Sequence, residues 1–248
     1  MPAASLSGPA YLLRGLRLIR QPGLRRYAVL PVLIALVIFV LLAVAAYAYF
    51  GVLLDRLLPG GEGWWATGLR AILWPLFFLA VALVWYFGFT VAANLAAAPF
   101  NGLLAEKVEA RLTGAPPAPT DWRALLADLL PAMLNELRKL AYYLLWAVPL
   151  GILFLVPGIN LAAPLLWGLF AAWMHALEYL EYPMENHGLR FPEVRRRARR
   201  LGPGGLGFGA AVMFATLVPV LNLVVMPAAV AGATAFWVDR LKDDGEAR

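Results

Sequence analysis

The sequence predicts an all-α integral membrane protein with two long transmembrane helices, two partly penetrating (re-entrant) helical hairpins, and amphipathic cytoplasmic or interfacial helices. Of the 248 residues, 62% are apolar and 15% are charged, and mean hydropathy is +0.72. Soluble domains are about 45–50% apolar and about 25% charged. Four stretches contain no Asp, Glu, Lys or Arg, namely 27–54, 71–105, 140–177 and 201–238. Each is long enough to enter or cross a hydrocarbon core about 30 Å thick.

The first half of the chain is expected to cross the membrane twice. The segment 1–27 contains no acidic residue and five arginines, Arg14, Arg17, Arg20, Arg25 and Arg26. This bias predicts a cytoplasmic start, and it explains the pI near 9.8 without any nucleic-acid partner. Helices at 28–53 and 69–95 then run outward and back. The first is too long for the apolar core of a signal peptide, which spans about 7–15 residues.

Residues 99–140 are expected to form cytoplasmic or interfacial helices. Charged residues punctuate a helical pattern that stops at Thr113-Gly114. The proline-rich run 115–119 reads as a stiff linker. Thr120 or Asp121 then offers an N-cap for an amphipathic helix that reaches Lys139.

The second half of the chain contains an internal repeat that predicts two helical hairpins, at 141–177 and 206–238. Leu155-Val156-Pro157-Gly158-Ile159-Asn160-Leu161 matches Leu217-Val218-Pro219-Val220-Leu221-Asn222-Leu223, about halfway along each stretch. The arms before the turns would be only about 20–22 Å long, too short to cross comfortably. Two pairs of short transmembrane helices with shallow turns remain the alternative. The basic segment 178–205 between them fits the cytoplasmic side beside anionic lipid, and the whole chain, 1–248, reads as a single membrane domain.

Signatures of catalysis are missing from the sequence. It has no cysteine, no phosphate-binding loop of the P-loop type, and two histidines that form no H-E-x-x-H pair. His175 reads as a packed helix residue and His187 as a turn residue. We therefore expect no enzyme activity, no catalytic residue, no metal site and no cofactor.

One segment suits an anion. Pro22-Gly23 breaks any preceding helix, which places Leu24, Arg25 and Arg26 in the first turn of the next one. Backbone amides there lack intrahelical acceptors and lie at the positive end of the helix dipole. Two guanidinium groups and these amides could bind an oxyanion together. From these residues alone, ordinary topology-determining arginines are the simpler interpretation.

Several ordered blocks make the chain resemble the CysZ sulfate permease family over nearly its full length. The blocks are Gln21–Arg26, Ala97–Glu106, Glu109–Gly114, Val156–Ile159, Glu181–Pro183 with Asn186-His187, and Met226–Asp239. The resemblance implies sulfate uptake across the bacterial inner membrane by a multi-pass protein, feeding assimilation into cysteine without an ATP-binding subunit. It implies an oligomer as well, and it assigns the sulfate site to Gly23, Leu24, Arg25 and Arg26.

A route and a driving force follow as hypotheses. Neutral donors at Asn101, Asn160 and Asn222 could line a permeation path, because they replace hydration without holding a dianion tightly. Candidate proton carriers are Glu106, Glu109, Glu178 and Glu181, and the alternative for each is an ordinary interfacial or ion-paired carboxylate. Channel and proton symporter both remain open. So does a different class of protein, a non-transporting assembly or regulatory partner in the membrane.

Overall fold

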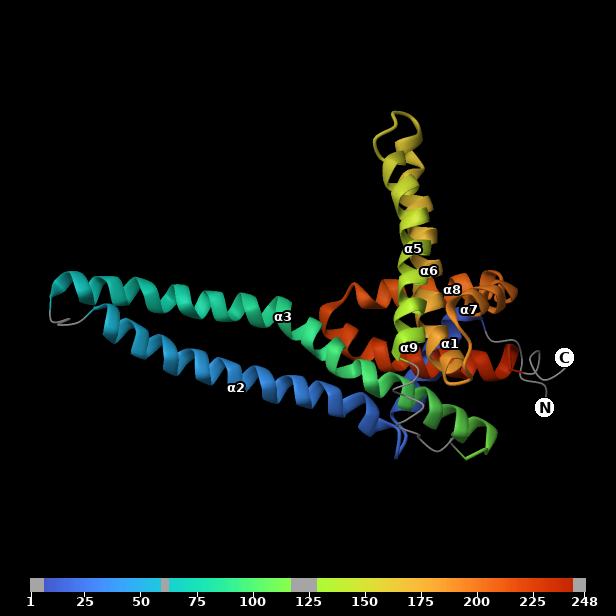
Figure 1. The fold of residues 1–248 in the computed structure, drawn as a ribbon, viewed down its shortest axis with the longest axis horizontal. Coiled ribbons are helices and arrows are strands. Elements are labelled where there is room, and N and C mark those ends of the chain that lie inside the picture. The colour runs from blue at the N-terminus through green and yellow to red at the C-terminus, as the bar shows by residue number, and fades with distance from the viewer. Residues whose placement is uncertain (1–6, 59–62, 117–128, 243–248) are drawn as a thin grey trace. The chain divides into compact units, whose positions relative to one another are not determined.

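The computed structural model describes residues 7–58, 63–116 and 129–242, and the described backbone contains helices and no strand (Figure 1). The all-α prediction is therefore confirmed for this part of the chain. Contacts divide the chain into two compact units, one made of 1–28 and 99–248 and the other of 29–98. The end of the proline-rich linker and the expected cap at Thr120 or Asp121 lie outside the described residues.

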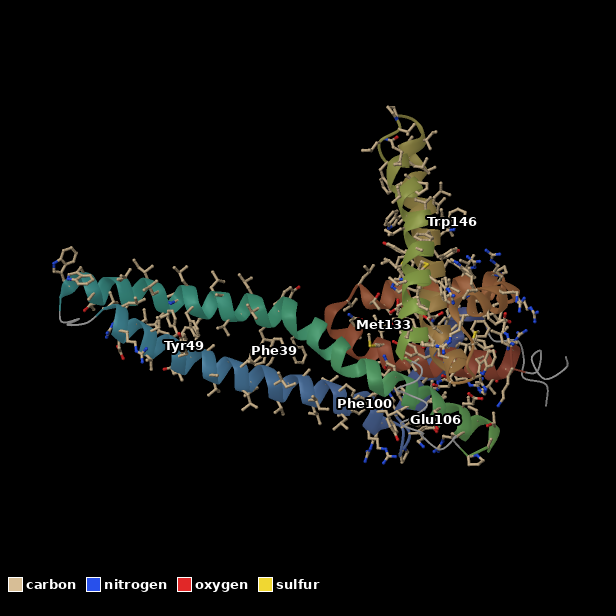
Figure 2. The ribbon with its side chains drawn as sticks, viewed as in Figure 1. Phe39, Tyr49, Phe100, Glu106, Met133 and Trp146 are labelled. Carbon is tan, nitrogen blue, oxygen red and sulfur yellow. The ribbon has the colours of Figure 1, made fainter. Side chains whose placement is uncertain are left out.

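The unit 29–98 is a pair of long apolar helices lying side by side (Figure 1). It contains most of α2 (Arg25–Leu57) and the first part of α3 (Trp64–Thr113). Aromatic rings join them: Phe39 lies between the two helices (Figure 2), 5.5 Å from Phe89, and Phe50 stacks on Phe77 at 4.4 Å. In the most apolar 18-residue stretch of α2, only 11% is buried inside the protein; in the corresponding stretch of α3, none is. These are helices whose apolar side chains face outward, and both are long enough to cross a membrane.

α3 is longer than the predicted second span. It continues without a break beyond residue 95 to Thr113 and ends at Gly114, which has φ +74°. Its later part is rich in Ala, Leu and Glu, which favour helix, and it continues through Pro99 and Gly102. The predicted stop at Thr113-Gly114 is confirmed.

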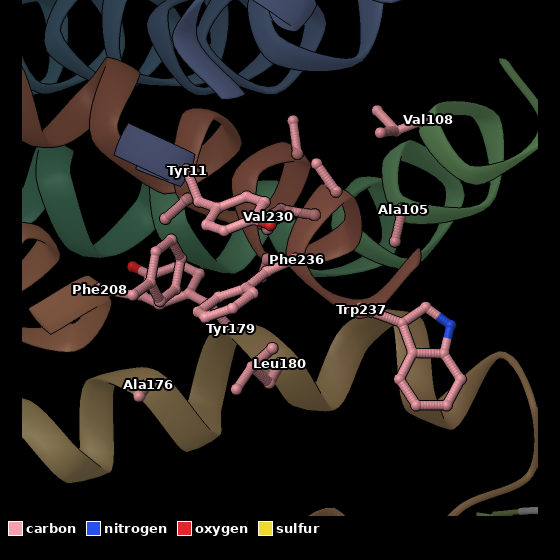
Figure 3. Close-up of a cluster of buried hydrophobic side chains, with 14 of the residues drawn as sticks. Tyr11, Ala105, Val108, Ala176, Tyr179, Leu180, Phe208, Val230, Phe236 and Trp237 are labelled. Atoms are coloured by element: carbon pink, nitrogen blue, oxygen red, sulfur yellow. The ribbon is translucent and has the colours of Figure 1, made fainter. Parts of the chain in front are cut away.

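The other unit has a helical core made by α1 (Gly8–Ile19), α6 (Ala163–Glu185), α8 (Pro203–Thr216) and α9 (Pro219–Arg240). In the close-up of Figure 3, Tyr11 stacks on Phe236, with ring centroids 4.1 Å apart, and Phe208 meets the edge of Phe236. The Tyr11 hydroxyl and Arg14 both donate to Asp239. Aromatic packing and one shared carboxylate thus fasten α1 to α9.

Glycines let these helices approach closely. A Cβ on Gly15 of α1 would lie 1.9 Å from the Ala228 carbonyl oxygen of α9, and one on Gly209 of α8 would lie 1.8 Å from the Ala172 carbonyl oxygen of α6. Because the obstructing atoms are backbone, a side chain could not be accommodated by a rotamer change. Small residues at such crossings are typical of helix packing in membranes.

Two helical hairpins occur where the repeat predicts them. α5 (Leu129–Leu153) and α6 are joined by a turn that includes the 3-10 helix η1 (Ile159–Leu161), and α8 and α9 turn at 217–218. The repeat is visible in the backbone: the Asn160 amide donates to the Val156 carbonyl at 2.9 Å, and the Asn222 amide donates to the Val218 carbonyl at 3.0 Å.

The first arm of the α5–α6 hairpin is longer than the segment from Tyr142 suggested. α5 begins at Leu129, so the amphipathic segment and the arm are one helix about 37 Å long. The reason is that residues 132–148 contain neither Pro nor Gly. Length alone therefore does not identify this hairpin as re-entrant.

Exposure divides α6 into two parts, whereas α5 exposes large apolar side chains from Leu130 onward. Near the turn, large apolar side chains are exposed; Trp146 in Figure 2 is one of them. They are Leu144, Leu145, Trp146, Val148, Ile152, Phe154, Leu155, Ile159, Leu161, Leu165, Leu166 and Leu169. At the other end, α6 is buried in the core and contacts α7 (Phe191–Ala198), which leads into the 3-10 helix η2 (Arg199–Leu201). The apolar end lacks a protein partner among the described residues.

Candidate functional site

The segment Gln21–Arg26 is a tight turn between α1 and α2. Gly23 has φ +90°, a conformation that side chains disfavour, and a Cβ there would meet nothing within 4 Å. The requirement for glycine is thus conformational rather than steric. Leu24 is buried in the hydrophobic core and anchors the turn. α2 begins at Arg25, close to where the sequence places the helix start.

Arg25 and Arg26 lie exposed at the start of α2. Arg26 donates to the Tyr27 hydroxyl at 3.1 Å and lies over the Tyr27 ring at 4.9 Å. Within residues 7–58, 63–116 and 129–242, neither arginine forms an ion pair with a carboxylate. The turn thus presents two adjacent cations that no described acidic side chain neutralises.

The sequence predicts backbone amides at this turn that are free to bind an anion, but two of them are already hydrogen-bonded. The Leu24 and Arg25 amides both donate to the Gln21 carbonyl, at 3.2 Å each. The reason is that Pro22-Gly23 folds the chain back, so that the Gln21 carbonyl caps the start of the helix. The guanidinium groups, rather than these two amides, are the donors that the turn presents outward.

The three candidate path asparagines lie in three different places. Asn101, on α3, is buried and donates to the Tyr182 hydroxyl at 3.3 Å. Asn160 is exposed in η1, and Asn222 is half-buried in the first turn of α9. No hydrogen bond joins any two of them among the described residues.

Glu109, one of the candidate proton carriers, is buried and multiply bonded. His187 Nε2 lies 2.8 and 3.0 Å from its two carboxylate oxygens, and Lys242 Nζ lies 2.9 Å from Oε1. Glu106 and Glu109 line a cavity of about 230 Å³ that His187 and Lys242 also border. His187 does lie in a turn, as expected, but its contact with Glu109 was not foreseen.

Glu181 is buried in a polar cluster between α5, α6 and α7, whereas Glu178 is exposed. Asn135 Nδ2 donates to Glu181 at 2.9 Å and to Glu185 at 3.1 Å, and Lys139 donates to Glu181 at 2.8 Å. Burial raises the pKa of the Glu181 carboxyl, while Lys139 opposes that rise. Burial, followed by the charge of Glu181, raises the pKa of Glu185 to about 7.

Sequence reasoning missed Asn135, Lys139 and Glu185. A signal was present, because Asn135 and Lys139 are four residues apart on α5, as Glu181 and Glu185 are on α6. Residues at that spacing share one face of a helix. Their pairing depends on how the two helices face each other, which the sequence pattern does not specify. In the described residues, no group of three or more His, Cys, Asp or Glu side chains could hold a metal ion.

Comparison with known proteins gives consistent matches along the chain. The family model described as "Sulfate transporter CysZ/Etoposide-induced protein 2.4" matches residues 11–227. A Pseudomonas fluorescens (strain Pf0-1) protein named sulfate transporter CysZ is 46% identical over 96% of this chain and 95% of its own length. Proteins of the same name from Pseudomonas aeruginosa (strain LESB58) and Pseudomonas paraeruginosa (strain PA7) are 45% and 46% identical, over 99% of this chain and 98% of each relative.

Proposed function

This chain belongs to the sulfate transporter CysZ/etoposide-induced protein 2.4 family, and we propose that it is a sulfate permease of the bacterial inner membrane. It imports sulfate for assimilation into cysteine without an ATP-binding subunit, and it works as a homo-oligomer. The observation that carries the proposal is the arginine pair at the start of α2, in a chain whose full-length relatives are named sulfate transporters.

Arg25 and Arg26 bind the sulfate, with Gly23 and Leu24 shaping the turn that presents them. Guanidinium groups make strong, directional hydrogen bonds to oxyanions. Described carboxylates do not compete for these two, and the positive end of the α2 dipole lies beside them. Because both side chains are exposed, sulfate is captured at the membrane surface before it moves further.

The membrane covers α2, the first part of α3 and the apolar end of the α5–α6 hairpin. On α5 the last charged residue is Lys139, and Tyr142, just beyond it, accepts a hydrogen bond from Trp173 and lies under Arg195. Aromatic and arginine side chains of this kind favour the headgroup level. From Tyr143 to its end at Leu153 the helix rises about 16 Å, less than the hydrocarbon thickness of about 30 Å. The hairpin therefore penetrates one leaflet and turns back, and the short α8–α9 hairpin does the same.

Protons supply the driving force. Moving a dianion against 100 mV costs about 4.6 kcal/mol, since each charge costs about 2.3 kcal/mol. Co-transport of two protons removes this electrical cost. A channel-like path, by contrast, needs a large external excess of sulfate or its rapid removal inside.

Binding of radiolabelled sulfate to purified protein tests the site. R25A/R26A should lose saturable binding, while R199A/R200A, which removes the same charge from another exposed stretch, should keep it. Equal binding by wild type and R25A/R26A would contradict the site. A folded protein that binds sulfate yet gives no uptake into liposomes would favour the partner-protein alternative.

A further inference from the structure

A buried polar cluster at the foot of the α5–α6 hairpin connects three helices through one side chain. Asn135 of α5 is 1% exposed. Its Nδ2 donates to Glu181 and Glu185 of α6, and its Oδ1 accepts from the Phe191 amide at 2.6 Å, at the start of α7. One amide group therefore fixes two carboxylates and the beginning of a neighbouring helix.

Among the described residues, the carboxylates of this cluster outnumber the cations. Glu136 and Lys139 face it from α5, and Arg190 faces it from the residue before α7. Lys139 bonds both Glu181 and Glu136, so its charge is divided between them. On α7, Glu193 pairs with Arg196 and Arg197, and Arg195 lies over the Tyr142 ring. α8 has no charged residue. At the end of α9, Asp239 bonds Arg14, Arg240 bonds the Tyr11 hydroxyl, and Lys242 bonds Glu109. In the part of the chain that the structure describes, three carboxylates of this cluster thus face two cations.

Two carboxylates held by one amide group cannot both ionise at low cost. When one is charged, the neighbouring negative charge and the partial loss of water favour a proton on the other. Glu181 has the Lys139 ammonium at 2.8 Å, whereas no ammonium is bonded to Glu185 among the contacts of the described residues. The proton therefore resides on Glu185, whose pKa of about 7 lies within the physiological range.

We propose that Glu185, paired with Glu181 through Asn135, is a proton-binding residue that couples proton movement to sulfate transport. The inference rests on the proposed function and gives it a second substrate. Binding the proton neutralises one carboxylate where α5, α6 and α7 meet, and releasing it restores repulsion between Glu181 and Glu185. Because these residues lie at the foot of the hairpin, the proton changes how firmly its two arms are held together. Each proton carried inward also removes one of the two charges that accompany sulfate.

The test compares sulfate uptake into proteoliposomes with an inward proton gradient and without one. Wild type should be accelerated several-fold by the gradient. E185Q keeps an acceptor for Asn135 but cannot titrate, so its gradient-to-no-gradient ratio should fall to about one. D55N is the control, because Asp55 is an exposed carboxylate outside this cluster that bonds Arg70, and it should retain the wild-type ratio. E185D keeps a titratable carboxyl and should retain acceleration, which guards against a folding defect in E185Q.

A second measurement detects protonation of the carboxyl group directly and does not depend on transport. Infrared spectra of wild type should lose a protonated-carboxyl band between pH 6 and pH 8, and E185Q should lack that change. A gradient response kept by E185Q, or no titrating carboxyl in this range, overturns the inference while leaving sulfate transport intact. Failure of wild type to admit any sulfate overturns the proposed function itself, and the inference with it.

Discussion

Replacing Glu185 by Gln should stabilise the folded protein in mildly alkaline buffer and leave its stability unchanged in acid. The folded state raises the pKa of this carboxyl from 4.5 to about 7. Between those values the folded protein holds a proton that the unfolded chain has lost. Stability contributed by that proton is complete below pH 4.5 and is lost as pH rises to about 7. Gln resembles the protonated acid, so E185Q avoids the loss.

The size of the effect follows from the pKa change and from exposure. A rise from 4.5 to about 7 corresponds to about 3 kcal/mol at most, at about 1.4 kcal/mol for each pH unit. Glu185 is only partly buried, and solvent screens its interactions. We therefore expect E185Q to exceed wild type by about 1–2 kcal/mol at pH 8 and to equal it at pH 4.5.

Unfolding in mixed micelles, followed by tryptophan fluorescence, measures this difference, since the chain has nine tryptophans. D55N serves as the control and should show a small difference that hardly varies with pH, because Asp55 is mostly exposed and lies outside this cluster. A free-energy difference for E185Q that is the same at pH 4.5 and pH 8 would refute the reasoning. So would a variant less stable than wild type at pH 8.

Other predictions test helix packing and the membrane surface. Gly15→Ala should destabilise the protein by about 3 kcal/mol or more, because its Cβ would strike the backbone of α9; Gly168→Ala, with open space around it, should not, and thermal unfolding compares them. Leu155→Lys should lower sulfate uptake several-fold without loss of core stability, because Leu155 is 81% exposed at the tip that we place in the bilayer. Leu155→Met is its control, and equal uptake by both variants would contradict the placement.

Much of the fold could be predicted from the sequence because apolar length and chain breaks are local signals. The two long helices, the stop at Thr113-Gly114 and the turns near Asn160 and Asn222 all follow from runs of residues. The joining of the amphipathic segment and the first hairpin arm into one helix, α5, was not predicted, although no helix breaker separates the two parts. Depth in the membrane remains a proposal.

The candidate site could be predicted only in part, for a physical reason. Pro22-Gly23 encodes a turn before a helix, so the sequence could predict that Arg25 and Arg26 lie at the start of that helix, where they are exposed. The hydrogen bonds from the Leu24 and Arg25 amides to the Gln21 carbonyl could not be predicted, because they depend on how the turn folds back on itself. Contacts such as His187 with Glu109, or Asn135 with Glu185, join residues 78 and 50 positions apart, and only packing brings them together.

Uptake of radiolabelled sulfate into liposomes that contain the purified wild-type protein tests the central claim most directly. We expect entry well above that of protein-free liposomes, saturating with sulfate concentration and faster when the exterior is more acidic than the lumen. Entry no faster than in protein-free liposomes, from protein shown to be folded and inserted, would contradict the account that this chain is a sulfate permease.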